Sequence, residues 1–392
     1  MPDDMDARAR RIARFIKPLR VKPGSKVDLG RDFDPRYKAG IRRKKDGLEL
    51  LRVGKELLAD YQARLAAQER YGVLVCLQAI DAGGKDGTIR HVMSGMNPQG
   101  VHVSSFKVPS AEELGHDYLW RYQARLPARG DIAIFNRSRY EEVLVVRVHP
   151  ENLERQKLPA HSTGKDIWQS RYAEINDWER YLTRNGIIVV KLFLNLSKEE
   201  QRARFLKRID LPEKNWKFSA ADVRERQHWD EYQRAFEQML SATSTPSAAW
   251  YVIPADRKWF ARLCAGAVLA HTLIKIDPRY PTVSQDAWQQ LQTARRELEA
   301  EAPEGTPADP FTEAGKRRRG QRPAVADPAR GALTVAPALG RVHERSFGRL
   351  DTPSRPTRFR INEIFGRIRR PAMGSCVTTT RPSAAKPRHA LP

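Results

Sequence analysis

The feature that most constrains this chain is an alternation of short apolar runs with longer amphipathic segments. The runs are rich in β-branched residues, which favours strands. They cover residues 72–80, 101–107, 131–136, 187–196 and 250–255. Helix-length segments separate them, and a further helix is expected over residues 48–69. Near-continuous apolar strands joined by helices predict an α/β fold with a five-stranded parallel sheet that is covered by helices on both faces.

The last part of the chain differs from the rest in composition. Residues 301–392 contain 18 basic and 8 acidic residues, 12 of the 26 prolines, and little apolar periodicity. This composition is typical of disorder, because too little apolar surface can be buried. One short stretch, residues 359–368, has the pattern of a transient helix. We therefore expect a basic N-terminal extension over residues 1–47, a globular domain over 48–300, and a disordered basic tail over 301–392.

Composition also limits the class of protein. The net charge is +23, which favours anionic partners such as nucleotides, polyanions or nucleic acid. Three cysteines are too few for a disulfide framework or a cysteine zinc site. No apolar run approaches the roughly 20 residues of a membrane span, and the N-terminus has no apolar signal core. We therefore expect a cytoplasmic protein without a membrane partner.

The first apolar run ends in a glycine-rich turn that precedes a helical segment. The turn contains Asp81, Ala82, Gly83, Gly84, Lys85, Asp86, Gly87 and Thr88. Glycines let backbone N–H groups approach phosphate closely, and the helix N-terminus favours an anion. Lys85 adds a positive charge for phosphate oxygens. The usual pattern has a hydroxyl residue at position 86 for Mg²⁺, so we expect another ligand, Asp81, unless that carboxylate only caps the helix.

The third apolar run leads into a second polar stretch. Asn136 occupies a place where many phosphate-loop enzymes have a metal-holding Asp, and Arg137 has the forked geometry that suits phosphate. Glu141 and Glu142 are anionic, so they are poor phosphate ligands and better acceptors for base amino or ribose hydroxyl groups. Their alternative role is to stabilise the first turn of a helix.

A basic segment follows the fourth apolar run, over residues 198–217. Arg204, Lys207 and Arg208 share one helical face by their spacing, and Lys214 and Lys217 continue the row beyond Pro212. We expect this segment to form a lid over a phosphate chain, although an ordinary solvated helix face has the same pattern. Arg90, Lys107 and Arg147 are weaker candidates of the same kind.

Several motifs in order resemble the second polyphosphate kinase family, whose members have a fold like that of thymidylate kinase. The motifs include LQAIDAGGKDGTIRHVMSGMNPQG, GDIAIFNRSRYEEVLVVRVHP, SKEEQRARFLKRIDLPEKNWKFS and WYVIPADRKWF. The resemblance covers roughly residues 20 to 280. It implies reversible phosphoryl transfer between inorganic polyphosphate and adenine nucleotides, which depends on Mg²⁺, or on Mn²⁺ in its place. The F-N-R-S sequence resembles the branch that phosphorylates both AMP and ADP.

The resemblance also implies roles for individual residues. Asp81 matches the metal ligand, Lys85 the phosphate-loop lysine, and Arg137 the arginine that contacts the transferred phosphate. Glu141 and Glu142 match the acidic pair of the nucleotide site, with Asn136 beside them. We expect a homo-oligomer that has no specific nucleic-acid partner.

Two other functions remain open at this point. An ATP-dependent nucleoside monophosphate kinase would share the fold and the phosphate loop. A non-catalytic binder of polyanions or nucleic acid would use the positive charge alone, although the globular part has no recognised nucleic-acid motif.

Overall fold

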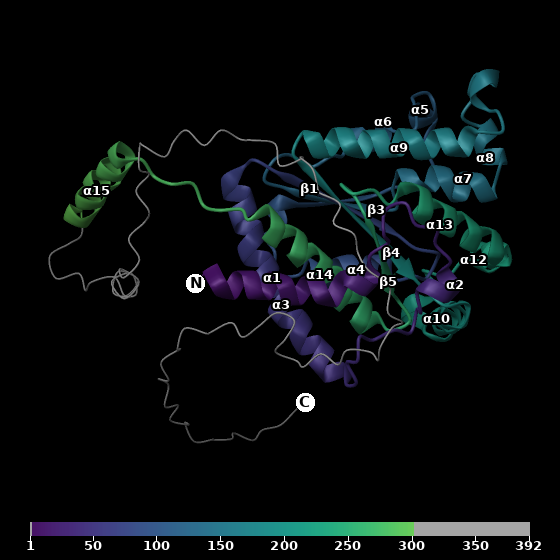
Figure 1. Ribbon diagram of the computed structural model, residues 1–392, viewed down its shortest axis with the longest axis horizontal. Helices are drawn as coiled ribbons and strands as arrows, with labels where there is room; N and C mark the ends of the chain where they lie inside the picture. The colour runs from purple at the N-terminus through teal and green to yellow at the C-terminus, as the bar shows by residue number, and fades with distance from the viewer. Residues whose placement is uncertain (1, 302–392) are drawn as a thin grey trace, which may run out of the picture.

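A five-stranded parallel sheet forms the centre of the computed structural model, which describes residues 2–301 (Figure 1). The strands run in the order β2-β3-β1-β4-β5. They are β1 (Gly72–Gln78), β2 (Val101–Ser105), β3 (Ile132–Asn136), β4 (Ile187–Asn195) and β5 (Trp250–Pro254). Each strand lies within one of the five apolar runs, so the predicted α/β fold is confirmed.

The register of the sheet decides where its polar ends meet. β1 lies between β3 and β4, with Val73 opposite both Ile132 and Ile188. Because every pair is parallel, all five strands point their carboxyl ends toward the same edge. In open sheets of this kind, ligands bind at that edge. The segments that follow β1, β3, β4 and β5 are therefore brought together.

The helices vary widely in length. The longer ones are α1 (Pro2–Ile16), α3 (Lys44–Gln68), α4 (Lys85–Val92), α9 (Ile167–Arg184), α10 (Lys198–Asp210), α13 (Trp229–Thr243), α14 (Lys258–Ile276) and α15 (Gln285–Ala300). The shorter ones are α2 (Leu29–Asp32), α5 (Ala111–Leu114), α6 (Trp120–Gln123), α7 (Val145–Val148), α8 (Glu151–Glu154), α11 (Pro212–Asn215) and α12 (Ala220–Glu225). Single 3₁₀ turns are η1 (Lys17–Leu19), η2 (Pro98–Gly100), η3 (Arg139–Val143), η4 (Ala160–Ser162) and η5 (Arg226–His228).

Helices cover both faces of the sheet, as the sequence predicted. α1, α3, α4 and α14 lie on one side, and α9 and α13 lie on the other (Figure 1). Alternate residues of β1 serve the two sides: Val73 and Val75 belong to the larger core, whereas Leu74 and Cys76 belong to a smaller one that includes Leu182 of α9. This alternation follows from the two-residue period of a strand.

The N-terminal segment belongs to the same core. Ile12 and Phe15 of α1 and Leu19 of η1 are buried in the larger core. The segment then runs beside β5, where the Val21 N–H donates to the carbonyl of Trp250 at 2.9 Å. The core thus extends across the boundary that we placed at residue 47, because apolar residues of α1 pack against α14.

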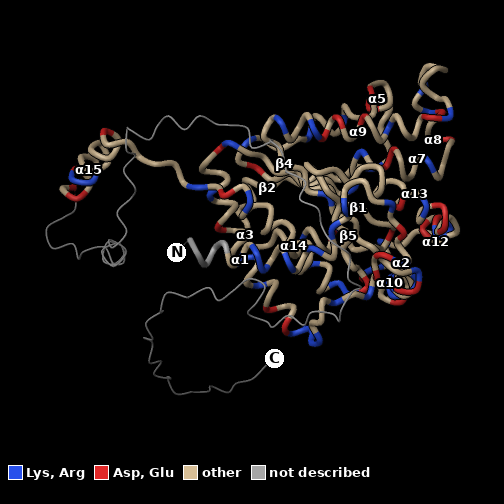
Figure 2. Tube along the Cα trace, in the orientation of Figure 1, with Lys and Arg blue, Asp and Glu red and all other residues tan. Residues whose placement is uncertain are grey.

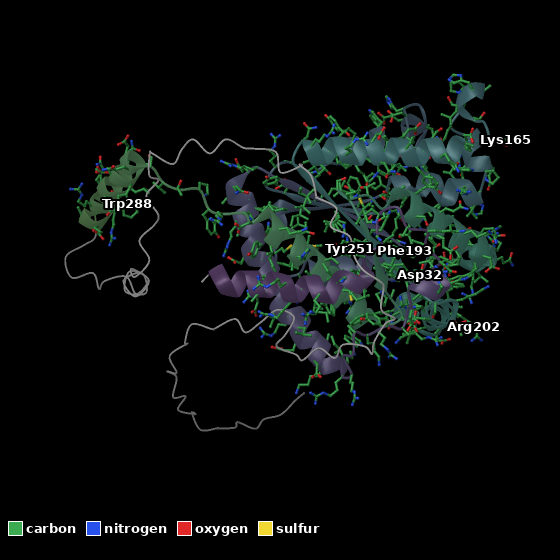
Figure 3. The ribbon with its side chains drawn as sticks, in the orientation of Figure 1. Asp32, Lys165, Phe193, Arg202, Tyr251 and Trp288 are labelled. Atoms are coloured by element: carbon green, nitrogen blue, oxygen red, sulfur yellow. The ribbon has the colours of Figure 1, made fainter. Side chains whose placement is uncertain are left out.

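The C-terminal end of the described chain stands apart. α15 has no buried residues, and it lies away from the sheet and its helices, with Trp288 exposed on it (Figure 3). The predicted disordered tail and the short helix over residues 359–368 lie outside the described residues.

Helix α14 is more apolar than we expected from the sequence. By length and composition it is the one candidate membrane span among residues 2–301, with a mean hydropathy of 1.3. Its apolar side chains lie inside the fold, where they pack against α3, α1, α4 and β5. The helix is apolar over most of its surface because other elements cover it, whereas Lys258 and Lys275 near its ends are exposed.

A group of buried charges lies between the sheet and α9. Lys191, in the middle of β4, donates from its ammonium to Glu179 at 2.7 Å, to the Tyr140 hydroxyl at 2.9 Å, and to the Thr243 carbonyl at 2.5 Å. Arg139 donates to the other oxygen of Glu179. The side chains of Arg139, Glu179 and Lys191 are fully buried. A lysine ammonium has three donors, and here all three are used.

We predict that replacing Glu179 with Gln strongly destabilises the protein. The change leaves two buried cations without a counter-charge, and breaking a buried pair in this way costs about 3–5 kcal/mol. Urea unfolding measures the effect. The matched control is Asp177→Asn on the same helix, where the partner Arg180 is exposed. This control should change the free energy of unfolding by no more than about 0.5 kcal/mol, and equal losses for the two variants would contradict the assignment.

Candidate functional site at the carboxyl edge of the sheet

The glycine-rich turn after β1 forms a tight loop ahead of α4. Ala82 and Gly84 have positive φ angles of 60° and 102°. At Gly83 a Cβ atom would lie 2.5 Å from the Cβ of Ala79, so no larger residue fits without movement. α4 then begins at Lys85, and the Thr88 N–H donates to the Gly84 carbonyl. The loop thus has the predicted order of strand, glycine turn, lysine and helix, which suits a phosphate group.

Lys85 lies half-buried within this loop. Its ammonium donates to the carbonyl of Ala79 at 2.8 Å. Burial, followed by the positive charge of Arg137, lowers the pKa of Lys85 to about 8, although the carboxylates of Asp81 and Glu141 act in the opposite direction. An anion in the loop would favour the charged form of this lysine.

Arg137 reaches the phosphate loop from the end of β3. Its guanidinium donates to Asp81 at 2.9 Å and to Glu141 at 3.0 Å. The charge of Glu141 raises the pKa of Arg137 above its usual value, so the group stays positive. Its φ angle is 66°, a conformation that costs a non-glycine residue roughly 1 kcal/mol or more. This conformation directs Arg137 toward the loop, where it binds Asp81 and lies near Lys85.

Asn136 lies beside Asp86 at the end of β3. Its amide N–H donates to Asp86 at 2.9 Å, and its buried amide oxygen has no hydrogen-bond partner among the described residues. Asp81 is the second carboxylate at this edge. No three carboxylate, histidine or cysteine side chains between residues 2 and 301 could hold a metal ion together. Two carboxylates with an amide oxygen nevertheless fit Mg²⁺, which binds through few protein oxygens and completes its shell with water and substrate phosphates.

The two glutamates of the predicted acidic pair point in different directions. Glu141 faces Arg137, whereas Glu142 is buried on the other side, where it accepts from Gln156 at 2.7 Å and pairs with Arg171 at 3.4 Å. Burial raises the pKa of Glu142, and Arg171 opposes that shift. The two neighbours therefore do not form one acidic surface.

Two adjoining cavities lie on this side of the site, and the smaller one opens beside Arg137. The smaller, of about 300 Å³, is lined by Arg137, Glu141 and Phe106 among others. The larger, of about 590 Å³, lies between the segment around α5 and α6 and the start of α9. Both are lined by Arg121 and Glu142, so together they lead away from the phosphate loop.

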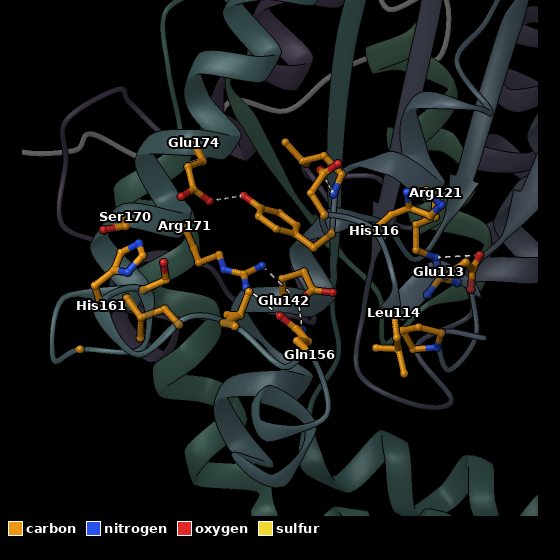
Figure 4. A pocket seen from close by; sticks show the side chains of 18 of the residues that line it. Glu113, Leu114, His116, Arg121, Glu142, Gln156, His161, Ser170, Arg171 and Glu174 are labelled. Atoms are coloured by element: carbon orange, nitrogen blue, oxygen red, sulfur yellow. Dashed lines mark hydrogen bonds and ion pairs between the residues drawn. The ribbon is translucent and has the colours of Figure 1, made fainter. Parts of the chain in front are cut away.

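The walls of the larger cavity combine aromatic and charged groups. The guanidinium of Arg171 lies 3.9 Å from the ring centroid of Tyr118, and the Tyr118 hydroxyl donates to Glu174 at 2.8 Å. Figure 4 shows Arg171 directed toward Glu142 and Gln156, with Arg121 paired to Glu113 on the opposite wall. A flat, polar-edged molecule fits such walls.

Arg204 does not belong to an exposed basic row. Its side chain is buried and donates to the carbonyls of Ala82 at 2.9 Å and Gly83 at 3.1 Å, and to that of Ala255. It also pairs with Glu200 at 2.8 Å. Helical spacing predicted that Arg204, Lys207 and Arg208 share one face, but Lys207 is exposed, whereas the Arg204 side chain packs against the phosphate loop. The guanidinium therefore holds the loop through its backbone.

The other basic residues of the segment do not form one exposed row either. Arg208 pairs with Asp222 at 3.2 Å, and Lys214 lies 3.6 Å from Glu213. Lys207 and Lys217 are exposed, the latter with its ammonium 4.7 Å from the ring centroid of Trp216. The turn at Pro212 begins α11, so these residues do not continue one straight row.

Several residues at the site were not found from the sequence. They are Arg121, Tyr118, Arg171 and Glu174 around the larger cavity, and Gln201, whose amide donates to the carbonyl of Asp81 at 3.0 Å. No local pattern marks them, because they reach the site from helices that the chain brings there only on folding. Lys191 could have been noticed from the sequence, because it is a lone charge in the apolar run VVKLFL.

More than half of the chain is similar to known proteins. The family model described as "Polyphosphate kinase 2" matches residues 41–281. An "ADP-polyphosphate phosphotransferase" of Rhodopseudomonas palustris is 51% identical over 286 residues, which are 72% of this chain and 98% of that protein. An "AMP/ADP-polyphosphate phosphotransferase" of Meiothermus ruber is 45% identical over 267 residues, which are 68% of this chain and 96% of that protein.

A solved structure has the same architecture. The crystal structure of polyphosphate kinase 2 from Arthrobacter aurescens has a TM-score of 0.65 and 38% sequence identity. The match covers 72% of this chain and 95% of that one.

We predict that an anionic chain binds the phosphate loop with uptake of a proton above pH 8. Lys85 has a pKa of about 8 without an anion and loses its proton as the pH rises through that value. A bound polyanion restores the charge, so proton uptake should increase from pH 7 to pH 9. Calorimetric titration with long-chain polyphosphate, in buffers with different heats of ionisation, measures it.

The matched control for this prediction is Lys85→Arg, because a guanidinium stays charged throughout the range. Uptake should be absent in this variant. The same uptake in both proteins would show that another group titrates.

Proposed function

The chain belongs to the polyphosphate kinase 2 family, and from that premise we propose how its site carries out the reaction. The protein is a polyphosphate:nucleotide phosphotransferase, the activity for which the Rhodopseudomonas and Meiothermus relatives are named. The observation that carries the assignment to this edge of the sheet is the meeting of Lys85, in the loop after β1, with Arg137 after β3. Two cations from neighbouring strands suit the phosphoryl group that is transferred.

The acceptor nucleotide is proposed to occupy the two adjoining cavities. Its terminal phosphate lies toward Arg137, and its base lies toward Tyr118 and Arg171. This orientation is supported by the walls, which are aromatic and polar away from the phosphate loop and carry Arg137 at the near end. The combined cavity is large enough for a nucleoside with its phosphates.

The transfer needs positioning and charge neutralisation more than covalent help from the protein. An oxygen of the nucleotide's terminal phosphate attacks the terminal phosphorus of polyphosphate in line. The bond to the next phosphate breaks, and the chain leaves one phosphate shorter. Lys85 and Arg137 stabilise the negative charge on the transferred group. Asp81 and Glu141 hold Arg137 in place through its two nitrogens.

The transfer depends on a metal ion, and we propose that it is Mg²⁺, with Mn²⁺ as a substitute. Asp81, Asp86 and the unpartnered amide oxygen of Asn136 would hold it. The ion, when bound, neutralises charge on the phosphate oxygens. Asn136 is thereby proposed for the metal side of the site, which is one of the two roles that the sequence suggested, and not for the nucleotide side.

AMP and ADP are both proposed as acceptors. The F-N-R-S sequence, and the relative that is named for both nucleotides at 45% identity, support this choice. A cytoplasmic location and a homo-oligomer stay predictions from the sequence, as does the division into an extension, a domain and a tail.

One experiment separates these proposals from their alternatives. The full chain is incubated with Mg²⁺ and either AMP or ADP, and with long-chain polyphosphate or ATP as the sole phosphoryl donor. Formation of ADP and ATP from polyphosphate supports the proposal. Phosphorylation of AMP from ATP alone would instead favour a nucleoside monophosphate kinase. Salt-dependent binding of nucleic acid without turnover would favour a non-catalytic binder.

We predict that Asp81→Asn shifts the Mg²⁺ dependence of turnover to higher concentration by at least about tenfold, the lower end of effects seen when a metal site is weakened. The reason is the loss of one of two carboxylates, with no hydroxyl at position 86 to replace it. A Mg²⁺ titration at saturating substrates measures the shift. The control is Asp60→Asn on α3, an exposed carboxylate paired with Arg64. An unchanged titration for Asp81→Asn would remove Asp81 from the metal site.

We also predict that Glu142→Gln raises the KM for the nucleotide more than the KM for polyphosphate. Glu142 positions Arg171, whose guanidinium covers Tyr118 in the cavity wall. Loss of its charge loosens that wall without touching the phosphate loop. Steady-state kinetics with each substrate varied in turn separates the two constants. A change confined to the KM for polyphosphate would place Glu142 on the donor side.

A further inference from the structure

Five cations from three helices lie together against the phosphate loop, on the side away from the two cavities. We call them the cationic cluster: Arg90 of α4, Arg204 and Lys207 of α10, and Lys258 and Arg262 of α14. Arg204 binds the carbonyls of the loop directly. A guanidinium nitrogen of Arg262 lies 3.5 Å from the position that a Cβ on Gly87 would take, so Arg262 touches the first turn of α4.

The cations of the cluster lie close enough to shift one another's pKa values. Burial, followed by the charge of Arg204, lowers the pKa of Lys258, and Lys207 and Arg262 add to this shift. Burial, followed by the charges of Arg90 and Arg204, lowers the pKa of Arg262. The cations are therefore close enough to repel one another.

Little negative charge opposes the cluster. Glu200 is the carboxylate that faces Lys258, and it is already bonded to Arg204 at 2.8 Å. Among the described residues, Arg90, Lys207, Lys258 and Arg262 form no ion pair within 4 Å. Basic and acidic residues lie close together on other elements, as on α10 and α12, where Arg208 pairs with Asp222 (Figure 2). An unneutralised group of cations beside a phosphate loop suits a bound anion.

We propose that the polyphosphate chain leaves the phosphate loop over the cationic cluster, between α10 and the first turns of α14. The proposal rests on the function proposed above and names the path of its donor. Polyphosphate carries about one negative charge per phosphate, so a long chain needs a series of cations, as a nucleic-acid backbone does. The cluster begins at the loop, whereas Lys214 and Lys217 lie beyond the end of α10 on another turn.

The direction of the path also agrees with the cavities. The nucleotide side of Arg137 is lined by residues from α5 to α9, and the cationic cluster comes from α4, α10 and α14. Donor and acceptor then approach the phosphate loop from different sides. An in-line transfer requires such an arrangement.

The test is the double variant Lys258→Gln/Arg262→Gln in the full chain. We expect the KM for long-chain polyphosphate to rise about tenfold or more, and the KM for tripolyphosphate to rise less, because a short donor ends near the loop. The affinity should also fall less steeply with salt, by about one to two units of the log–log slope, since each phosphate that is no longer neutralised reduces the slope by just under one unit. The KM for the nucleotide should stay unchanged.

A matched control removes the same charge at another place. Arg125 and Arg129 are exposed and precede β3, where the strands begin, so they lie at the opposite edge of the sheet. Arg125→Gln/Arg129→Gln should keep the wild-type KM and salt slope for long chains. Equal effects of the two double variants would show that net charge alone is responsible and would overturn the proposal.

Two further outcomes would also overturn it. One is a Lys258→Gln/Arg262→Gln protein with normal tripolyphosphate turnover that keeps the wild-type KM for long chains. The other is a Lys214→Gln/Lys217→Gln protein that alone shows the large effect. Direct binding of long-chain polyphosphate to wild type and variant is measured in parallel. A wild type that binds the chain through the cluster but transfers no phosphate would refute the proposed function and leave this inference standing.

Discussion

The site depends on one buried carboxylate. Glu179 neutralises both Arg139 and Lys191 in the interior between the sheet and α9, and the Tyr140 hydroxyl donates to the same carboxylate. Arg139 is thereby fixed on the inner side of the chain that leaves β3. Arg137, two residues earlier, points to the opposite side, toward Asp81 and the phosphate loop. Its positive φ angle persists because the following residues are anchored in the interior.

A second constraint acts from the other side of the loop. Arg204 donates to two carbonyls of the phosphate loop and to Ala255 after β5, and so ties α10 to both segments. Cations in this protein therefore have two separate tasks. Those whose donors bind carbonyls or carboxylates, such as Arg204 and Lys191, hold the backbone. Those that lack a counter-charge in the described part of the chain, such as Lys258 and Arg262, remain available to an anion.

The sequence could predict what local pattern determines. Near-continuous apolar runs rich in β-branched residues located all five strands, and the order of strand, glycine, lysine and helix located the phosphate loop. Helical spacing also predicted that Arg204 and Lys207 share one face of α10. It could not tell that Arg204 packs inward, because the direction of a helix face depends on distant elements, here Ala82 and Ala255. For the same reason Glu141 and Glu142 were taken as a pair, although the chain turns between them and sends one to each side.

Arg137 lies between the two sides of the site, where the cavities meet the phosphate loop. One carboxylate from each side holds its guanidinium: Glu141 from the side of the cavities and Asp81 from the side of the loop. A guanidinium shared by two carboxylates is an electrically balanced group that does not attract phosphate strongly by itself. Asp81, one of the carboxylates proposed to hold the metal ion, is thus also a partner of Arg137, and binding of the ion and binding of phosphate would be coupled through this carboxylate.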